Sequence, residues 1–239
     1  MNHIVALSGG KDSTALALRL VEVEPRDYVY VCTPTGDELP EMFEHWNLLG
    51  KLLNKPLLPV TCGESLDGAI RRQNALPNWR QRWCTRILKI EPYLQWCATQ
   101  TPCVSYVGLR ADEESRPGII AQVPGVEMRF PLKEWGWGLK EVMGYLDERG
   151  VSIPRRTDCA KCFFQSLGEW WELWNEHPEI YSVAEEQEQN TGHTFRSPGR
   201  DSWPASLKSL REMFEQGAIP KSVREQDLFS TYRCRECSM

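Results

Sequence analysis

Seven consecutive residues near the start of the chain combine side chains and glycines that suit phosphate binding. They are Ser8, Gly9, Gly10, Lys11, Asp12, Ser13 and Thr14. An apolar run at 4–7 precedes them and a helical pattern at 15–23 follows. A strand, a glycine turn and a helix start of this kind direct backbone N–H groups and the positive end of the helix dipole at an anion. Because a lysine charge and two hydroxyls lie in the same turn, the segment predicts a phosphate site.

Cysteines form the second group of residues with chemical potential. The chain has nine, and two pairs have C-x-x-C spacing, Cys159 with Cys162 and Cys234 with Cys237. Such a turn directs two thiolates at one metal, and the neighbouring arginines and lysines favour thiolate. The pairs lie roughly 70 residues apart in the sequence, which is wider than in a compact zinc finger. Thiolate ligands suit zinc or an iron–sulfur cluster equally, so the spacing leaves the metal open.

The other cysteines divide into one candidate ligand and four inert thiols. Cys84 lies in a basic stretch at 70–92, where arginines alternate with tryptophans in a pattern that suits phosphates and stacked bases. The remaining four lie in apolar settings and are expected to be buried, because a free cysteine packs as a small hydrophobic residue. They are Cys32, Cys62, Cys97 and Cys103.

The elements that must position these residues alternate between strand and helix. Strand patterns at 27–32 and 57–60 flank a helical pattern at 41–53. This alternation predicts an α/β fold with a doubly wound parallel sheet, whose ligands bind at the carboxyl ends of the strands. The loop after the second strand brings Gly36, Asp37 and Glu38 to that edge. We expect the two acids to hold Mg²⁺ or the ribose, or else to be solvated loop acids.

A later strand pattern at 104–109 leads to further charged residues on the same edge. Gly108 lies near the end of this strand, and Arg110 and Glu114 follow it. The forked guanidinium of Arg110 suits phosphate. Glu114 is either functional or an acid near a helix start, where the dipole favours negative charge.

Composition and sequence pattern indicate the domain boundaries and exclude some classes of protein. A helix at 139–149 closed by Gly150 predicts the end of a nucleotide-binding domain at 1–150, followed by a helical, cysteine-rich subdomain at 151–239. The tryptophans of 169–176 are expected to pack in a core. The net charge of −5 excludes a generally basic nucleic-acid binder, and the absence of 18 consecutive apolar residues argues against a membrane span. With no signal peptide in the pattern, we expect a cytoplasmic protein.

Four motifs in this order resemble the phosphoadenosine phosphosulfate (PAPS) reductase-like branch of the ATP pyrophosphatase superfamily. They are the 8–14 segment, which matches the PP-loop, W-C-T-x-x-L-K-x-x-P at 83–92, the Gly108, Arg110, Glu114 and Ser115 set, and C-x-x-C-F-F-Q at 159–165. The resemblance implies a Rossmann-like, adenine nucleotide alpha-hydrolase-like fold that binds ATP and Mg²⁺. It implies catalytic roles for Lys11, Asp12, Arg110 and Glu114.

The resemblance also implies the remaining ligand contacts. Nucleotide contacts would come from the PP-loop, from 36–38, from Gly108 and from Lys89, which would face phosphate. A [4Fe–4S] cluster would stabilise the C-terminal part, and zinc is the alternative. Four of five candidate thiols would hold the metal. These are Cys84, Cys159, Cys162, Cys234 and Cys237.

Two chemistries divide this branch. In the first, ATP adenylylates an acceptor, pyrophosphate leaves and a sulfur donor displaces AMP. The chain resembles proteins of DNA phosphorothioation, which implies a cysteine desulfurase or another sulfur donor as partner, DNA or tRNA as acceptor, and a possible homodimer. In the second, a cysteine reduces a sulfonucleotide to sulfite. Such reductases typically lack the G-K-D that 10–12 retain here, which favours ATP chemistry, although Cys237 keeps the reductase alternative open. A third hypothesis is a non-catalytic nucleotide-binding adaptor.

Overall fold

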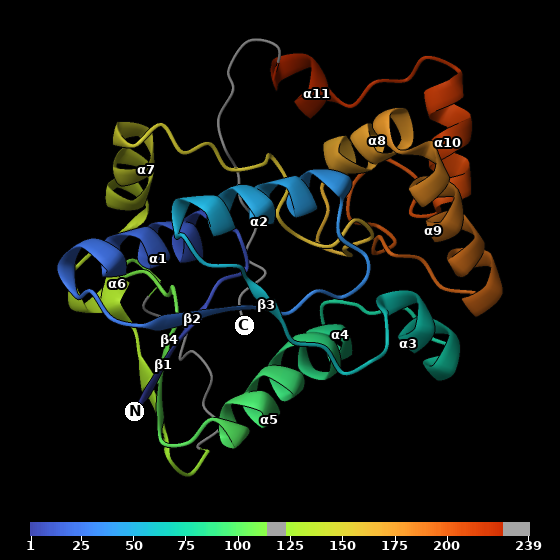
Figure 1. Cartoon of the computed structure of the whole chain (residues 1–239). Helices are drawn as coiled ribbons and strands as arrows, with labels where there is room; N and C mark the ends of the chain where they lie inside the picture. Colours follow the sequence, from blue (N-terminus) through green and yellow to red (C-terminus); the bar gives the residue numbers. More distant parts are fainter. Residues whose placement is uncertain (114–122, 227–239) are drawn as a thin grey trace.

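A five-stranded parallel sheet forms the centre of the molecule (Figure 1). The computed structural model describes residues 1–113 and 123–226. The strands lie in the order β3-β2-β1-β4-β5, and every neighbouring pair is parallel. Their bounds are β1 Asn2–Ala6, β2 Tyr28–Cys32, β3 Leu58–Pro59, β4 Cys103–Tyr106 and β5 Val126–Arg129. The predicted α/β class with a parallel sheet is confirmed.

The register of the central strand places the candidate phosphate loop at a crevice. Ile4 of β1 pairs with Val29 of β2 on one side and with Ser105 of β4 on the other. The chain therefore leaves β1 in one direction and returns to its other side only after β3, so the strand order reverses at β1. Ligands of doubly wound sheets bind at such a switch point, beyond the carboxyl ends of the strands.

Helices cover both faces of the sheet (Figure 1). The helices α1 (Lys11–Val23) and α7 (Leu139–Glu148) pack on one face, where Leu16, Leu20 and Leu146 are buried against Val5. The helix α5 (Glu91–Thr99) covers the other face, where Tyr93 and Cys97 pack on Ile4. Because β1 is buried from both sides, its sequence is a continuous apolar run rather than an alternating one. The helices α2 (Pro40–Leu52) and α6 (Pro131–Glu134) lie on the same face as α1 and α7, because Leu49 and Leu132 belong to their cluster.

The C-terminal helices share a second hydrophobic core with an earlier part of the chain. They are α8 (Leu167–Glu176), α9 (Pro178–Thr191) and α10 (Leu207–Glu215), and the short helix α11 (Lys221–Gln226) lies against α8. Their core residues pack together with residues of α3 (Leu66–Gln73), α4 (Trp83–Thr85) and the π-helical turn η1 (Arg86–Ile90). Trp170 is fully buried there, which confirms the core prediction for this tryptophan. The basic stretch and the C-x-x-C segment are thus held by one core.

Three of the four cysteines predicted to be inert are buried, namely Cys32, Cys97 and Cys103. The prediction is wrong for Cys62, which is exposed because it lies in the loop that follows β3. Burial raises the pKa of the Cys32 and Cys97 thiols to about 12, which keeps both protonated and unreactive. None of the helices within the described ranges is long and apolar enough to cross a membrane.

Candidate functional site

The loop between β1 and α1 is held in shape by its own hydroxyls. Ser13 Oγ accepts from the Gly9 N–H at 3.2 Å, donates to the Gly10 carbonyl at 3.1 Å and lies 3.0 Å from Ser8 Oγ. Gly9 has a φ of +91°, and a Cβ there would lie 2.7 Å from the indole nitrogen of Trp46. Glycine is therefore needed at this turn, which directs the start of α1 at the sheet edge.

Arg110 is fixed against the start of α1 by three carboxylates. Its guanidinium donates to Asp12 at 2.9 Å and to Asp112 at 2.8 Å, and lies 3.7 Å from a Glu113 oxygen. Burial alone would lower the pKa of Arg110, but the charge of Asp12 and the bond to Asp112 raise it, so the cation is permanent. The structure thus brings Lys11, Asp12 and Arg110 together at the switch point between β1 and β4.

Gly108 lies next to the same helix start. A Cβ at Gly108 would lie 3.0 Å from Ser13 N and 3.1 Å from the carbonyl carbon and oxygen of Asp12. These are backbone atoms, which cannot move aside as a flexible side chain can. Glycine here permits the end of β4 to pack directly on α1, and that contact places Arg110 within reach of Asp12.

Lys11 and Asp12 present groups that remain available for a ligand. Lys11 is buried, lies 3.6 Å from Asp12 Oδ2 and lines a cavity of about 230 Å³ together with Asp147 and Arg155. Asp12 Oδ2 accepts from Arg110, whereas Oδ1 is buried and has no partner within residues 1–113 and 123–226. A buried carboxylate oxygen without a donor is the type of ligand that Mg²⁺ prefers, so this residue fits the implied ion.

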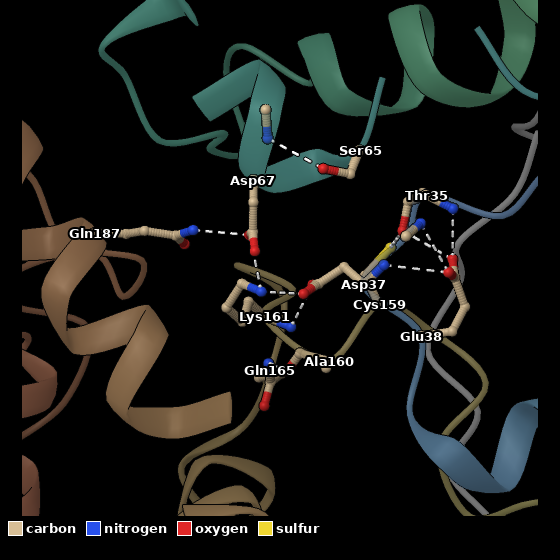
Figure 2. Close-up of polar contacts among 12 residues, drawn as sticks. Thr35, Asp37, Glu38, Ser65, Asp67, Cys159, Ala160, Lys161, Gln165 and Gln187 are labelled. Atoms are coloured by element: carbon tan, nitrogen blue, oxygen red, sulfur yellow. Dashed lines mark hydrogen bonds and ion pairs between the residues drawn. The ribbon is translucent and has the colours of Figure 1, made fainter. Parts of the chain in front are cut away.

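The acids of the loop after β2 make internal contacts. The Glu38 carboxylate accepts from the N–H groups of Thr35, Gly36 and Asp37, at 2.7, 3.0 and 3.2 Å. It also accepts from the Thr35 hydroxyl at 2.8 Å. Figure 2 shows these bonds, which close the loop around the Glu38 side chain.

Asp37 joins this loop to the C-x-x-C segment (Figure 2). Its two oxygens accept from the Lys161 ammonium and from the Lys161 N–H, the latter at 2.9 Å. The ammonium also lies 3.0 Å from Asp67, which in turn accepts from Gln187 at 2.7 Å. Burial raises the pKa of Asp37 to about 6 and Lys161 opposes this shift, so the carboxylate is charged at neutral pH and neutralises the lysine.

Three cysteines line one small cavity. Cys84 of α4 meets Cys159 and Cys162 at a cavity of about 20 Å³, which Lys89 and Lys161 also line. The Cys159 thiol lies 3.3 Å from the Thr35 hydroxyl, and Cys159 forms an isolated antiparallel bridge with Glu38. Across the described part of the chain, no group of three or more His, Cys, Asp or Glu side chains is arranged to hold a metal ion.

Several predicted residues lie elsewhere or cannot be placed. Lys89, assigned from the sequence to nucleotide phosphate, lines the thiol cavity. Glu114, Ser115, Cys234 and Cys237 lie outside the described residues. Sequence reasoning missed Glu113, whose carboxylate accepts from the Arg110 N–H at 3.1 Å, and Lys161. Lys161 bonds to Asp37 across 124 residues of sequence, so no local pattern signalled this contact.

Comparison with known proteins now gives the family. Among solved structures, a PAPS reductase from Candida auris in complex with phosphate is similar, with 18% identity, 64% of this chain and 75% of that chain covered, and a TM-score of 0.49. A predicted tRNA methyltransferase subunit from Methanocaldococcus jannaschii has 16% identity, 64% and 89% coverage, and a TM-score of 0.37. No curated protein matches the chain. The model of the phosphoadenosine phosphosulfate reductase domain matches residues 2–170, which is more than half of the chain. This protein therefore belongs to the phosphoadenosine phosphosulfate reductase domain family.

Proposed function

We propose that this protein is an ATP pyrophosphatase that adenylylates an acceptor for sulfur incorporation, with DNA phosphorothioate modification as the specific activity. The observation that carries this proposal is the cluster of Lys11, Asp12 and Arg110 beside the glycine turn. Two cations and a helix start converge there on the position where a phosphate chain would lie. The chain also retains the Gly10, Lys11 and Asp12 that sulfonucleotide reductases typically lack, which favours ATP as the ligand.

The reaction would proceed by positioning and charge neutralisation. The loop N–H groups and Lys11 would hold the β- and γ-phosphates, and Asp12 Oδ1 would hold Mg²⁺, which when bound supplies further positive charge. An acceptor oxygen would form a bond to the α-phosphorus while the bond to the bridging oxygen breaks, and pyrophosphate would leave with that electron pair. Arg110, held rigidly by its carboxylates, would stabilise the charge on the phosphates.

The thiol cavity supports a metal-stapled C-terminal part. Cys84, Cys159 and Cys162 would supply three thiolates, and Cys234 or Cys237 the fourth. We favour [4Fe–4S], with zinc as the alternative. A cavity of about 20 Å³ has room for one water-sized species, so the thiols would have to rearrange to hold either metal, and a cluster would require the larger movement.

The basic stretch supports nucleic acid, DNA or tRNA, as the acceptor. Trp79 is 58% exposed, and the Arg80 guanidinium lies over its ring at 4.8 Å. Exposed aromatic and cationic side chains of this kind stack on bases and contact phosphates. Sulfur would come from a cysteine desulfurase or another donor, and the enzyme would act in the cytoplasm, with a homodimer as a further possibility.

Pyrophosphate release from ATP tests this function. Anaerobically purified protein is expected to release pyrophosphate with Mg²⁺ and nucleic acid present, and Lys11→Ala is expected to abolish release while leaving the fold intact. Lys208→Ala, which changes an exposed lysine of α10, is the matched control. Unchanged turnover in Lys11→Ala would refute the phosphate role.

Sulfonucleotide reduction is the second candidate, because the family match and the C-terminal pair of Cys234 and Cys237 both favour it. Sulfite release from PAPS with a thiol reductant, in a preparation that does not turn over ATP, would establish this alternative. ATP binding without either reaction would instead support a non-catalytic adaptor.

A further inference from the structure

The loop that joins α3 to α4 (Figure 1) exposes a large aromatic side chain. Trp79 is 58% exposed, and among the large hydrophobic side chains that the structure describes only that of Met1, at 73%, is more exposed. The residues on either side are anchored, because Leu76 and Trp83 are buried in the core that the C-terminal helices share. Trp79 is thus held at the surface by a fixed loop, where its ring is available to a partner.

A closed turn and a cation fix the orientation of this ring. The Asn78 side-chain oxygen accepts from the N–H groups of Arg80 and Gln81, at 3.0 and 2.9 Å. The Arg80 guanidinium lies over the Trp79 ring, 4.8 Å from its centroid. Because the cation lies over one face of the indole, we expect a flat ligand to stack on the other face. An indole that is already fixed loses little freedom when it binds.

Several arginines of the same stretch are exposed and have no carboxylate partner in the described ranges. They are Arg71, Arg80 and Arg82. Two other arginines of the stretch do have such partners, since Arg72 pairs with Glu64 at 2.8 Å and Arg86 with Glu91 at 2.9 Å. The whole chain has 33 acidic residues and 28 lysines and arginines, so three arginines without acids create a local positive surface on an acidic protein. We call these three arginines and Trp79 the Trp79 patch.

The Trp79 patch borders the nucleotide edge of the sheet. The helix α3 begins beside the loop after β2, where the Leu66 N–H donates to the Thr35 carbonyl at 2.7 Å. At the other end of the patch, Arg82 lies over the Phe164 ring at 5.2 Å and lines the thiol cavity with Cys84. A polyanion held by these arginines would therefore lie next to the loop that borders the nucleotide site.

We propose that the Trp79 patch binds nucleic acid as a single strand, with an unpaired base stacked on the indole and phosphates on the three arginines. The inference rests on the proposed function and specifies its acceptor as unpaired nucleotides. A base inside a duplex is stacked on its neighbours, so an indole reaches a base face only where the strand is unpaired. A duplex offers the patch its phosphates, which arginines bind without help from a tryptophan. Stacking accepts every base, so we expect little sequence preference.

Fluorescence anisotropy of labelled oligonucleotides tests the proposal on the full-length chain without ATP. The probes are single-stranded DNA, single-stranded RNA and the DNA duplex of the same sequence, each roughly 12 nucleotides long, which is within the site sizes of single-strand binders. We expect a single strand to bind about tenfold more tightly than the duplex. The tighter of the DNA and RNA strands identifies the kind of nucleic acid.

Matched variants separate stacking from charge. Trp79→Ala is expected to weaken single-strand binding about tenfold, and Trp79→Phe to retain most of it, because stacking needs an aromatic ring. Arg71→Gln should weaken the binding of every probe and lower the slope of log affinity against log salt by about 0.7 for single strands. The controls are Phe43→Ala, at an aromatic side chain of α2 that is 50% exposed, and Arg26→Gln, at an exposed arginine before β2. Both should leave binding unchanged.

Three results would overturn the inference. They are no binding of any oligonucleotide, duplex binding as tight as that of the single strands, and equal affinity in Trp79→Ala and Phe43→Ala. Circular dichroism identifies a variant that has lost its fold. Single-strand binding without pyrophosphate release would refute the proposed function and leave this binding site in place. Pyrophosphate release that neither a single strand nor Trp79→Ala changes would do the reverse.

Discussion

The Lys161 ammonium and the Asp37 carboxylate form a buried ion pair across 124 residues of sequence, and each side chain is only 3% exposed. This pair attaches the loop after β2 to the segment that carries Cys159 and Cys162. The Ala160 N–H reinforces the attachment by donating to the Asp37 carbonyl at 2.6 Å. The position of two candidate metal ligands therefore depends on the same loop that borders the nucleotide edge of the sheet.

Lys161→Met is expected to destabilise the protein strongly. The substitution leaves Asp37 and Asp67 as neighbouring carboxylates without their cation, and removing one partner of a buried pair costs about 3–5 kcal/mol. The free energy of unfolding in urea measures this cost. Lys208→Met, at an exposed lysine, should stay within about 0.5 kcal/mol of the parent.

A double variant separates the ion pair from lost packing. Asp37→Asn/Lys161→Met removes both charges and is expected to be more stable than Lys161→Met alone. If Lys161→Met were as stable as Lys208→Met, the lysine would not neutralise these carboxylates.

Local sequence patterns predicted the strand, turn and helix at the start of the chain. They did not predict contacts between residues that lie far apart in the sequence. Residues close together in the sequence determine the apolar run at 4–7, the glycine turn and the helix after it, so these elements can be predicted from the sequence alone. The sequence also placed Asp37 and Glu38 on the correct loop. Their partners were not predictable, because Lys161 reaches Asp37 only through the packing of the C-terminal helices on α3 and α4. Strand β5, a half-exposed stretch of four residues, carried too little periodicity to be identified.

Gly108→Ala is expected to destabilise the protein and to displace the start of α1. The new methyl group would meet backbone atoms of Asp12 and Ser13 at 3.0–3.1 Å, and overpacking of this kind costs about 1–3 kcal/mol. Because α1 carries Lys11, we expect pyrophosphate release to fall as well. Unfolding in urea and nucleotide turnover measure the two effects.

Gly144→Ala is the matched control for that substitution. Gly144 lies inside α7, and within the described ranges a Cβ there would meet nothing within 4 Å beyond its chain neighbours and the backbone of its own helix. Alanine should therefore stabilise the helix, by about 0.5–1 kcal/mol. Equal stabilities of the two variants would contradict the close approach of β4 to α1.

Glu188 is expected to make stability fall as the pH rises. Burial raises its pKa to about 7, although its carboxylate accepts from the N–H groups of Phe195 and Leu207. Between pH 4.5, the ordinary pKa of a glutamate, and about pH 7, the folded state keeps a proton that the unfolded state has released. Stability contributed by the bound proton is therefore complete below pH 4.5 and is lost towards pH 7, by about 3 kcal/mol at most.

Comparison with Glu188→Gln isolates this effect. Asp37 titrates in the same window, with its pKa raised to about 6, but contributes equally to both proteins. Urea unfolding at a series of pH values from 4.5 to 8 should therefore show a steeper decline for the parent than for the variant. Parallel curves would mean that Glu188 is not the titrating group.

Loss of any thiol at the small cavity is expected to reduce bound metal. Cys84, Cys159 and Cys162 line the cavity together, and a serine in place of one removes a thiolate with only a small change in side-chain size. We expect Cys159→Ser to lose metal and to destabilise the C-terminal helices, which pack in the same core as α4.

Cys62→Ser, at an exposed cysteine after β3, is the control and should keep the metal content of the parent. Elemental analysis of anaerobically purified protein measures zinc and iron, and a broad brown absorbance accompanies only an iron–sulfur cluster. Full metal occupancy in Cys159→Ser would remove this residue from the ligand set and would leave its contact with Thr35 as its structural role.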